Sequence, residues 1–587
     1  MKNPILSVVS VTAGMTLLLS GCANDLNESN PSIEDQISVN KKAYVNIAVK
    51  YPSAGSSRSA TDSEGDTNSD ASPDFEIGSA EENNVTSALV VLTDINNNYV
   101  TYCMVDINDL EQVGPSNGMT THYKAAFDLG HIRNAYAEGS LEEGGSTNIW
   151  VYCNPTQQLL DMVKEGFSGE WMDWSGYWNG TQTENDIIWT DNHFLMTNST
   201  LYTRADLPGV DEWDKHTDEN NPYDLTQEIP VPVERVAARF DFKDGSTKGN
   251  STYSITNSDG TSELLTVQLT RMALVNVSNA YYFLRRVSAN GLMTNATYGG
   301  IETPVNYVVD LYSSEKSLKG EITPENAFDF FNYTLFDNQG NYSDYNWENI
   351  SDVISTPDDN WLSEPVYSKW HYLTENTIPS PAMNQKTVQT TGIVFEAKLS
   401  PGSATPETLQ NALNNVSASS PVLYLFDEIL YTGFDEAVAA AKSLPAGALY
   451  NAVSLALDAA GMSIDNYSGL TVLTPAVKEA MTSNGFTIYE PSLGNDGAWG
   501  YYCYYFYWNR HNDNGIPNMM GNMEFAVVRN NVYKISVDTL ERLGHPVEPD
   551  NDPDPVEPED PAEEAQVYMT LTIEVLPWVV RVNSVTY

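Results

Sequence analysis

The last residues of the chain carry its clearest strand pattern. Residues 567–587 read VYMTLTIEVLPWVVRVNSVTY, and apolar side chains alternate with polar ones as far as Val575. This two-residue period is typical of a β-strand with one buried face. At Leu576-Pro577 the phase reverses, which predicts two short strand arms joined at a kink. The apolar positions of the two arms are Val567, Met569, Leu571, Ile573, Val575, Trp578, Val580 and Val582.

A second isolated strand is predicted near the N-terminus. Residues 43–51 read AYVNIAVKY, in which Val45, Ile47 and Val49 alternate with less apolar side chains. The next residues, 52–74, are rich in Ser, Gly, Asp and Thr and cannot pack a core, and their one basic residue is Arg58. The C-terminal strand follows an acidic, proline-rich spacer, 546–566. A linker thus separates each terminal strand from the body of the chain.

The first residues have the features of an export signal. Lys2 precedes the apolar run 5–19, which is too short to span a bilayer comfortably and has the length of a signal-peptide core. The run leads into Leu19-Ser20-Gly21-Cys22, which resembles a bacterial lipobox. That resemblance implies removal of the signal peptide, residues 1–21, and lipidation of Cys22, whose acyl chains would anchor the precursor in a membrane. The alternative is an ordinary signal peptide with a chance cysteine.

Length and charge narrow the class of protein. A chain of 587 residues exceeds one ordinary core, so at least two domains are expected. A net charge of -50 argues against nucleic acid, because the surface would repel phosphates. Besides Cys22 the chain has Cys103, Cys153 and Cys503, with no CxxC spacing, so we favour buried thiols over a bridge and expect no zinc site.

The body of the chain reads as mainly β, in two tandem β-sandwich domains at 59–227 and 228–545. In 229–242, IPVPVERVAARFDF, two alternating runs of opposite phase predict a bulge at Glu234-Arg235, with the domain boundary just before this segment. Helices are predicted within the second domain because cap residues flank short apolar runs. These helices are expected after Thr405-Pro406, through 435–444, over 448–459 and over 475–484.

A search for catalytic and metal-binding patterns finds none that is convincing. No HExxH occurs, and the GxSxG at 114–118 lacks the strand-to-helix context of a nucleophile elbow. The DNDPDP run lacks the glycine and glutamate of a calcium loop. We therefore expect no enzyme activity, no cofactor and no metal. The tryptophan-rich stretch is expected to be core, with sugar stacking as the alternative; its tryptophans are Trp171, Trp174, Trp178 and Trp189.

Several stretches together resemble the fimbrillins of type V pili, most closely the Mfa-type major fimbrial subunits. They are the lipobox at Cys22, VTSALVVL at 85–92, PVERVAARF at 232–240, LVNVSNAYYFLRRVS at 274–288, and most of 484–583. The resemblance covers most of the chain and is loosest at about 300–480. It implies two transthyretin-like β-sandwiches, the second with inserted helices, and a flexible C-terminal donor strand.

The resemblance also implies a route of assembly. The subunit would be exported as a lipoprotein to the outer membrane, where an arginine-specific protease would cut the Arg58-Ser59 bond. The cut would release the strand that carries Val45, Ile47 and Val49, and the C-terminal strand, 567–587, of another copy would fill the groove. The product is a head-to-tail polymer, the shaft of a surface fimbrium that supports adhesion and biofilm formation. Implied partners are further copies, accessory fimbrial subunits, the protease, and host or bacterial surface ligands.

Two alternatives to this prediction remain at the level of sequence. One is a monomeric surface lipoprotein that binds glycans through its tryptophan-rich stretch and keeps its C-terminal strand in its own fold. The other is a tip or accessory fimbrial subunit. We favour donation to another copy, with the acidic spacer giving the strand reach and keeping it off its own domain.

Overall fold

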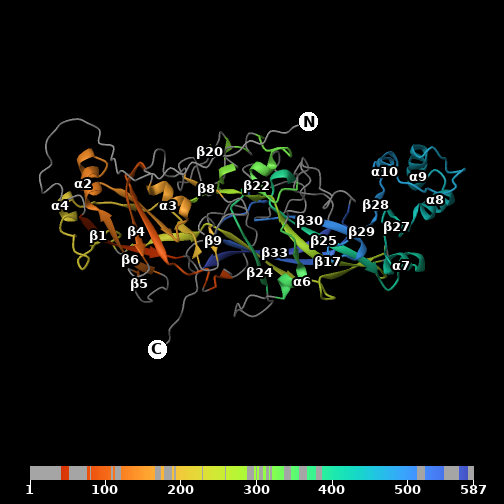
Figure 1. Ribbon diagram of the computed structural model, residues 1–587, viewed down its shortest axis with the longest axis horizontal. Helices are drawn as coiled ribbons and strands as arrows, with labels where there is room; N and C mark the ends of the chain where they lie inside the picture. Colours follow the sequence, from red (N-terminus) through yellow and green to blue (C-terminus); the bar gives the residue numbers. More distant parts are fainter. Residues whose placement is uncertain are drawn as a thin grey trace, which may run out of the picture.

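The computed structural model confirms that the chain is mainly β (Figure 1). It describes residues 41–51, 76–79, 81–106, 110–112, 120–164, 174–177, 188–190, 193–227, 229–257, 260–286, 297–298, 301–302, 308–312, 316, 320–335, 346–355, 367–377, 386–511, 523–547 and 568–579. Several predicted features lie outside these residues, namely Cys22, Arg58, Ser59, the GxSxG at 114–118 and residues 548–566 of the acidic spacer.

The first sandwich is built from a ten-stranded sheet. Its order is β4-β3-β7-β11-β14-β1-β6-β5, with β12 paired to β7 and β13 to β1. Alternate side chains of these strands share one apolar core, which includes Val90, Phe127 and Val151. The strands are β1 (Lys42–Lys50), β3 (Ser87–Thr93), β4 (Tyr99–Asp106), β5 (Leu110–Gln112), β6 (Thr120–Asp128), β7 (Thr147–Cys153), β11 (Met196–Asn198), β12 (Thr203–Arg204), β13 (Tyr223–Asp224) and β14 (Val231–Arg235).

Three helices accompany this sheet, α2 (Leu129–Glu138), α3 (Gln157–Lys164) and α4 (Val210–Trp213). The Asp128 side chain caps α2 by accepting from the Gly130 and His131 amides, and Gly139 ends the helix at a positive φ of 80°. Helices α2 and α4 lie with β1 at one end of the molecule (Figure 1).

The bulge predicted at Glu234-Arg235 is wrong, and so is a domain boundary ahead of it. Glu234 and Arg235 are the last residues of β14, which pairs with β11 and β1 in the first sheet, whereas the residues from Ala238 form β15 (Ala238–Asp244) in another sheet. The chain crosses between the sandwiches at Val236-Ala237, both fully buried. The phase of the alternation reverses there because the strand changes core, and the first sandwich extends to Arg235.

The second sandwich consists of two sheets that pack face to face. One has the order β2-β33-β31-β15-β24, and the other β16-β17-β25-β30-β29 with β23 and β32 alongside. The rings of Phe242 and Phe395 pack against each other between the sheets, with their centroids 5.9 Å apart. The remaining strands are β2 (Glu76–Ile77), β16 (Thr252–Thr256), β17 (Glu263–Val275), β23 (Glu348–Asn349), β24 (Ser368–Leu373), β25 (Gly392–Pro401), β29 (Pro491–Leu493), β30 (Trp499–Trp508), β31 (Asn531–Leu540), β32 (His545–Pro546) and β33 (Met569–Val579).

A helical lobe is inserted between β25 and β30 and forms the far end of the molecule from β1 (Figure 1). The predicted helices are confirmed there. Helix α10 begins after Thr474, whose hydroxyl accepts from the Val477 amide at 3.4 Å. The lobe contains α7 (Glu407–Asn414), β26 (Leu423–Phe426), β27 (Ile429–Thr432), α8 (Phe434–Ser443), α9 (Ala448–Ala459), α10 (Pro475–Thr482) and β28 (Thr487–Tyr489).

Short elements complete the described chain. Strand β8 pairs with β19, β9 with β10, β18 with β22 and β20 with β21. These strands are β8 (Ser175–Tyr177), β9 (Trp189–Thr190), β10 (His193–Phe194), β18 (Val277–Ser278), β19 (Ala280–Tyr282), β20 (Thr297–Tyr298), β21 (Ile301–Glu302) and β22 (Phe331–Asn332), and a short helix α6 spans Ile350–Ile354. No helix of the described residues is long and apolar enough to cross a membrane.

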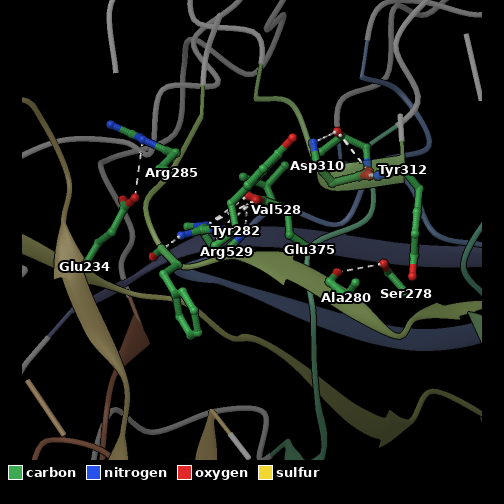
Figure 2. A network of polar contacts seen from close by, with 12 residues as sticks. Glu234, Ser278, Ala280, Tyr282, Arg285, Asp310, Tyr312, Glu375, Val528 and Arg529 are labelled. Atoms are coloured by element: carbon green, nitrogen blue, oxygen red, sulfur yellow. Dashed lines mark hydrogen bonds and ion pairs between the residues drawn. The ribbon is translucent and has the colours of Figure 1, made fainter. Parts of the chain in front are cut away.

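One buried ion pair connects the two sandwiches, and another lies beside it in the second sandwich (Figure 2). Arg529 contacts Glu375 at 3.0 Å and donates to the Tyr282 carbonyl at 2.8 Å. Glu234 of β14 lies 3.3 Å from Arg285. Burial raises the pKa of Glu234 to about 7, against the lowering effect of Arg285 and Arg529. Glu234 and Arg285 are thus paired across the junction, and Arg529 and Glu375 within the second sandwich, because buried charges need partners.

Candidate functional site

The first strand of the described chain lies inside a sheet rather than at its edge. Strand β1 runs antiparallel to β6 along its whole length, from Lys42 opposite Asp128 to Lys50 opposite Thr120. On its other side it runs parallel to β13 and β14, with Val49 opposite Val231. A parallel neighbour cannot be reached through a tight hairpin, so β1 is placed by tertiary contacts alone.

The side chains of β1 fill the centre of the first core. Val45, Ile47 and Val49 are fully buried, as their alternation predicts. They share a core with Tyr123 and Phe127 of β6 and with β14. Burying each such aliphatic side chain stabilises the fold by about 1.5 to 3 kcal/mol. Without β1, this core would therefore be open along the whole length of one strand.

The backbone of β1 is satisfied from both sides. Besides the β6 ladder, the Tyr44 amide donates to the His216 carbonyl at 2.8 Å, and the Asn46 carbonyl accepts from the Leu225 amide at 3.0 Å. The Ala48 amide donates to the Thr226 hydroxyl at 3.0 Å. If β1 were withdrawn, these partners would be left unpaired in an apolar groove. This is costly unless another strand occupies the position of β1 between β6 and β14, which we call the seat of β1.

A polar contact closes the C-terminal end of this seat. Tyr51 follows β1 directly, and its hydroxyl is hydrogen-bonded to the hydroxyl of Tyr123. The Tyr123 hydroxyl also lies 3.9 Å from the Cys153 thiol. Burial raises the pKa of both tyrosines, so both phenols are neutral. A hydroxyl group at this position can therefore hydrogen-bond to Tyr123.

The C-terminal strand pairs with its own chain. Strand β33 runs antiparallel to β31, from Met569 opposite Leu540 to Pro577 opposite Asn531, with one irregularity between Val537 and Thr539. The expectation that the spacer keeps this strand off its own domain is wrong for the single chain. The physical reason is that β31 would otherwise be a sheet edge with unpaired backbone groups. Donation to another copy stays a prediction.

Only part of the predicted donor face lies within the described residues. Met569 is buried, with 8% of its surface exposed, and Leu571 packs against the second core. Val567, Val580 and Val582 lie outside the described residues. The kink predicted at Leu576-Pro577 coincides with the end of the ladder to β31, and Trp578 and Val579 are the residues that pair with β2.

The other candidate residues from the sequence lie either in the core or outside the residues that the structure describes. Cys103, Cys153 and Cys503 are free and buried, which confirms the prediction of buried thiols, and burial raises the pKa of each to about 12. Trp174 is buried as expected of core. Among the described residues no cluster of His, Cys, Asp and Glu could hold a metal ion.

Two parts of this arrangement had no signal in the sequence. Strand β2 has two residues, too few to show a period, although it pairs with the C-terminal strand. Glu82 lies in a polar turn that reads as surface, yet it is 1% exposed and bound by Arg239. A carboxylate three residues before the strand at 85–92 gives no hint of that burial.

Comparison with known proteins points to one family. Residues 500–584 match the family described as major fimbrial subunit protein type IV, fimbrillin, C-terminal. This stretch covers β30 from its second residue onward, β31, β32 and β33. No curated relative matches the chain.

Solved structures align over much of the chain at low similarity. The tip fimbrial protein Mfa3 from Porphyromonas gingivalis, with a C-terminal truncation, is 9% identical over 92% of this chain and 100% of that chain, with a TM-score of 0.32. A fimbrilin (FimA) from Porphyromonas gingivalis W83 is 14% identical over 92% and 99%, with a TM-score of 0.34. A fimbrial assembly protein from Parabacteroides distasonis ATCC 8503 is 7% identical over 61% and 96%, with a TM-score of 0.23.

Proposed function

We propose that this chain, whose residues 500–584 match the C-terminal fimbrillin family, is a structural subunit of the shaft of a surface fimbrium. The precursor is exported as a lipoprotein through Cys22 and reaches the outer membrane. An arginine-specific protease then cuts it, and the cut subunits polymerise head to tail by strand exchange. The fimbrium supports adhesion to host or bacterial surfaces and biofilm formation, together with accessory subunits.

The position of β1 carries the proposal. It is the first strand of the described chain, it occupies the middle of the first sheet, and its one covalent link to the rest of that sandwich is the segment after Tyr51. Cutting that segment converts β1 from part of the chain into a bound peptide. A peptide bound in this way can be replaced by a strand of similar pattern from another molecule.

Arg58 is suited to that cut. It is the one basic residue of 52–74, so an arginine-specific protease has one choice in this segment. The cut leaves Ser59 as the new N-terminus and leaves β1 attached only to the lipidated residues 22–58. Loss of β1 therefore also frees the subunit from its own membrane anchor, as a fibre that grows away from the surface requires.

The C-terminal strand is suited to fill the empty seat. It has apolar side chains at alternate positions in both arms, the pattern that β1 also has. In the single chain it lies next to the edge of its sheet, between β31 and the two-residue β2, so it can leave without dismantling the sheet. Strand exchange between identical chains is head-to-tail and does not close on itself.

The test is cleavage of the purified full chain with an arginine-specific protease. High-mass ladders on electrophoresis without boiling, and fibres in the electron microscope, are expected. An Arg58→Lys variant keeps the charge but removes the arginine, so it should remain monomeric. A cut chain that stays a stable monomer would overturn the proposal.

Deletion of residues 567–587 tests the donor separately. The truncated chain should be cut normally and should not form ladders, because no strand is available to fill the groove. Assembly that proceeds unchanged would show that another segment is the donor. A mixture of truncated and full chains should give shorter polymers, because each truncated copy ends a fibre.

The glycan-binding alternative receives no support from the described tryptophans. Trp174 is 3% exposed, and Trp189 packs against Tyr372 with ring centroids 6.3 Å apart. A tip position is less consistent with a donor strand, because a terminal tip subunit has no neighbour ahead of it that needs one.

A further inference from the structure

The two ends of β33 are held by different means. At its start, the Tyr568 carbonyl accepts from the Glu541 amide at 2.9 Å, and the Tyr568 ring stacks on His545 with centroids 5.0 Å apart. Met569, the next residue, is buried. These contacts hold the start of β33, so we expect release of the strand to begin at its other end, where the ladder to β31 stops at Pro577.

Strand β2 lies at the end from which we expect release to begin. Glu76 pairs with Trp578 and Ile77 with Val579, in parallel. The last residues of β33 therefore have β2 as a neighbour on the side away from β31. A strand flanked on both sides must break both sets of contacts to leave, whereas an edge strand breaks one.

Glu82 fixes the residues that follow β2 to the second sandwich. Its carboxylate accepts two hydrogen bonds from Arg239 of β15, at 2.9 and 3.0 Å, and one from the Tyr372 hydroxyl of β24 at 2.6 Å. Lys369 lies 3.5 Å away. Glu82 is 1% and Arg239 0% exposed. Charge-assisted bonds in such a dry site are strong and directional.

Short local contacts transmit this anchor to β2. The Ser79 amide donates to the Glu82 carboxylate at 2.6 Å, and the Asn83 side chain donates to the Gly78 carbonyl at 2.7 Å. Arg235 donates to the Glu82 carbonyl at 3.3 Å. Few residues separate Ile77 from these contacts, so fixing Glu82 also fixes where β2 can lie.

We propose that Glu76–Ile77 is a latch that retains the C-terminal strand on its own chain, and that Glu82 is the residue that positions this latch. The inference rests on the proposed function, in which this same strand is donated. It adds a barrier within each subunit that delays donation.

Hydrogen exchange on the uncut full chain tests the latch without any polymer. In a Glu76→Pro/Ile77→Pro variant, which removes both β2 amide donors and leaves Glu82 intact, amides at 575–579 should exchange at least about tenfold faster. A Glu82→Gln variant should do the same. Amides of β17 and β25 in the facing sheet should accelerate by a smaller factor than those at 575–579, and Glu81→Gln, at the exposed neighbouring carboxylate, is the matched control.

The outcomes decide the proposal separately from the proposed function. Wild-type exchange at 575–579 in the double-proline variant would overturn the latch, whether or not cut protein polymerises. If Glu82→Gln accelerates exchange in β17 and β25 by as large a factor as at 575–579, its role is general stability, and the positioning assignment fails. In cut protein that polymerises, both latch variants should form ladders several times faster; an unchanged rate would show that β2 is no barrier to donation.

Discussion

Tyr51 and Tyr123 join the end of β1 to β6 through a hydrogen bond between their hydroxyl groups. Tyr51 is the last described residue before the linker that holds Arg58, and Tyr123 lies in the first core opposite Ile47. Both phenols are kept neutral by burial. The bond therefore exists only while β1 is seated, which makes it a reporter of whether the seat is filled by its own strand.

Removing one of these hydroxyls should weaken only the uncut protein. Tyr51→Phe leaves the Tyr123 hydroxyl without its phenol partner, and we expect a loss of about 1 to 3 kcal/mol in the free energy of unfolding of the first sandwich. Urea titration of the uncut chain measures this loss. Once residues up to 58 have been removed, variant and wild type are the same molecule. A difference that persists after their removal would contradict the assignment of the bond to β1.

Truncation of a buried side chain of β1 should lower the free energy of unfolding more than truncation of an exposed side chain of the same strand. Ile47→Ala removes a fully buried side chain, and we expect the uncut first sandwich to lose about 2 to 5 kcal/mol. Lys42→Ala, at an exposed position of the same strand, is the matched control and should change little. Chemical unfolding of the two variants compares them directly. An equal loss of stability in the two variants would show that the buried Ile47 side chain stabilises the protein no more than the exposed Lys42 side chain does.

Local patterns predicted the parts of the fold that local forces determine. The alternation around Ile47 predicted a strand with one buried face, and the structure has that face fully buried. Helix α9 begins and ends at the predicted residues, Ala448 and Ala459, because helix propensity and the glycine at 461 act within a few residues.

Features that depend on distant partners could not be predicted in the same way. A bulge and a crossover between two cores both shift the alternation by one residue, so the pattern at Glu234-Arg235 could not tell them apart. The spacer composition predicted an unpacked tether, but it contains no information on which strand the residues after it will meet. Glu82 is buried because Arg239, far along the chain, folds onto it.

Lowering the pH should reveal how much the ionised Glu82 carboxylate contributes to the stability of the fold. Burial by itself would raise the pKa of Glu82, but Arg239, Lys369 and the Tyr372 hydrogen bond outweigh it and lower the pKa to about 2, from an ordinary value of 4.5. A lowered folded-state pKa gives stability that is present above pH 4.5 and lost as pH falls toward 2. The shift corresponds to about 3 kcal/mol.

The pH dependence of unfolding tests this contribution. Wild type should lose that stability between about pH 4.5 and 2, while Glu82→Gln, which has no carboxyl group to protonate, should lack this part of the slope. The Gln variant should also be less stable at pH 7, because Arg239 loses its charged partner. Parallel profiles for the two proteins over this range would show that Glu82 is not held ionised by its neighbours.

Thiol labelling should report the opening of the first sandwich and its refilling. In the uncut chain all three described thiols are buried with raised pKa, so alkylation at pH 8 should be slow at each. Removal of β1 takes away Tyr51 and uncovers the end of the seat beside Cys153, whose alkylation should then accelerate. Cys503, in β30 of the second sandwich, is the internal control and should stay protected. Occupation of the seat by another copy should protect Cys153 again. Mass spectrometry of the alkylated peptides measures each site, and equal labelling of Cys153 before and after release of β1 would mean that the core closes over the empty seat.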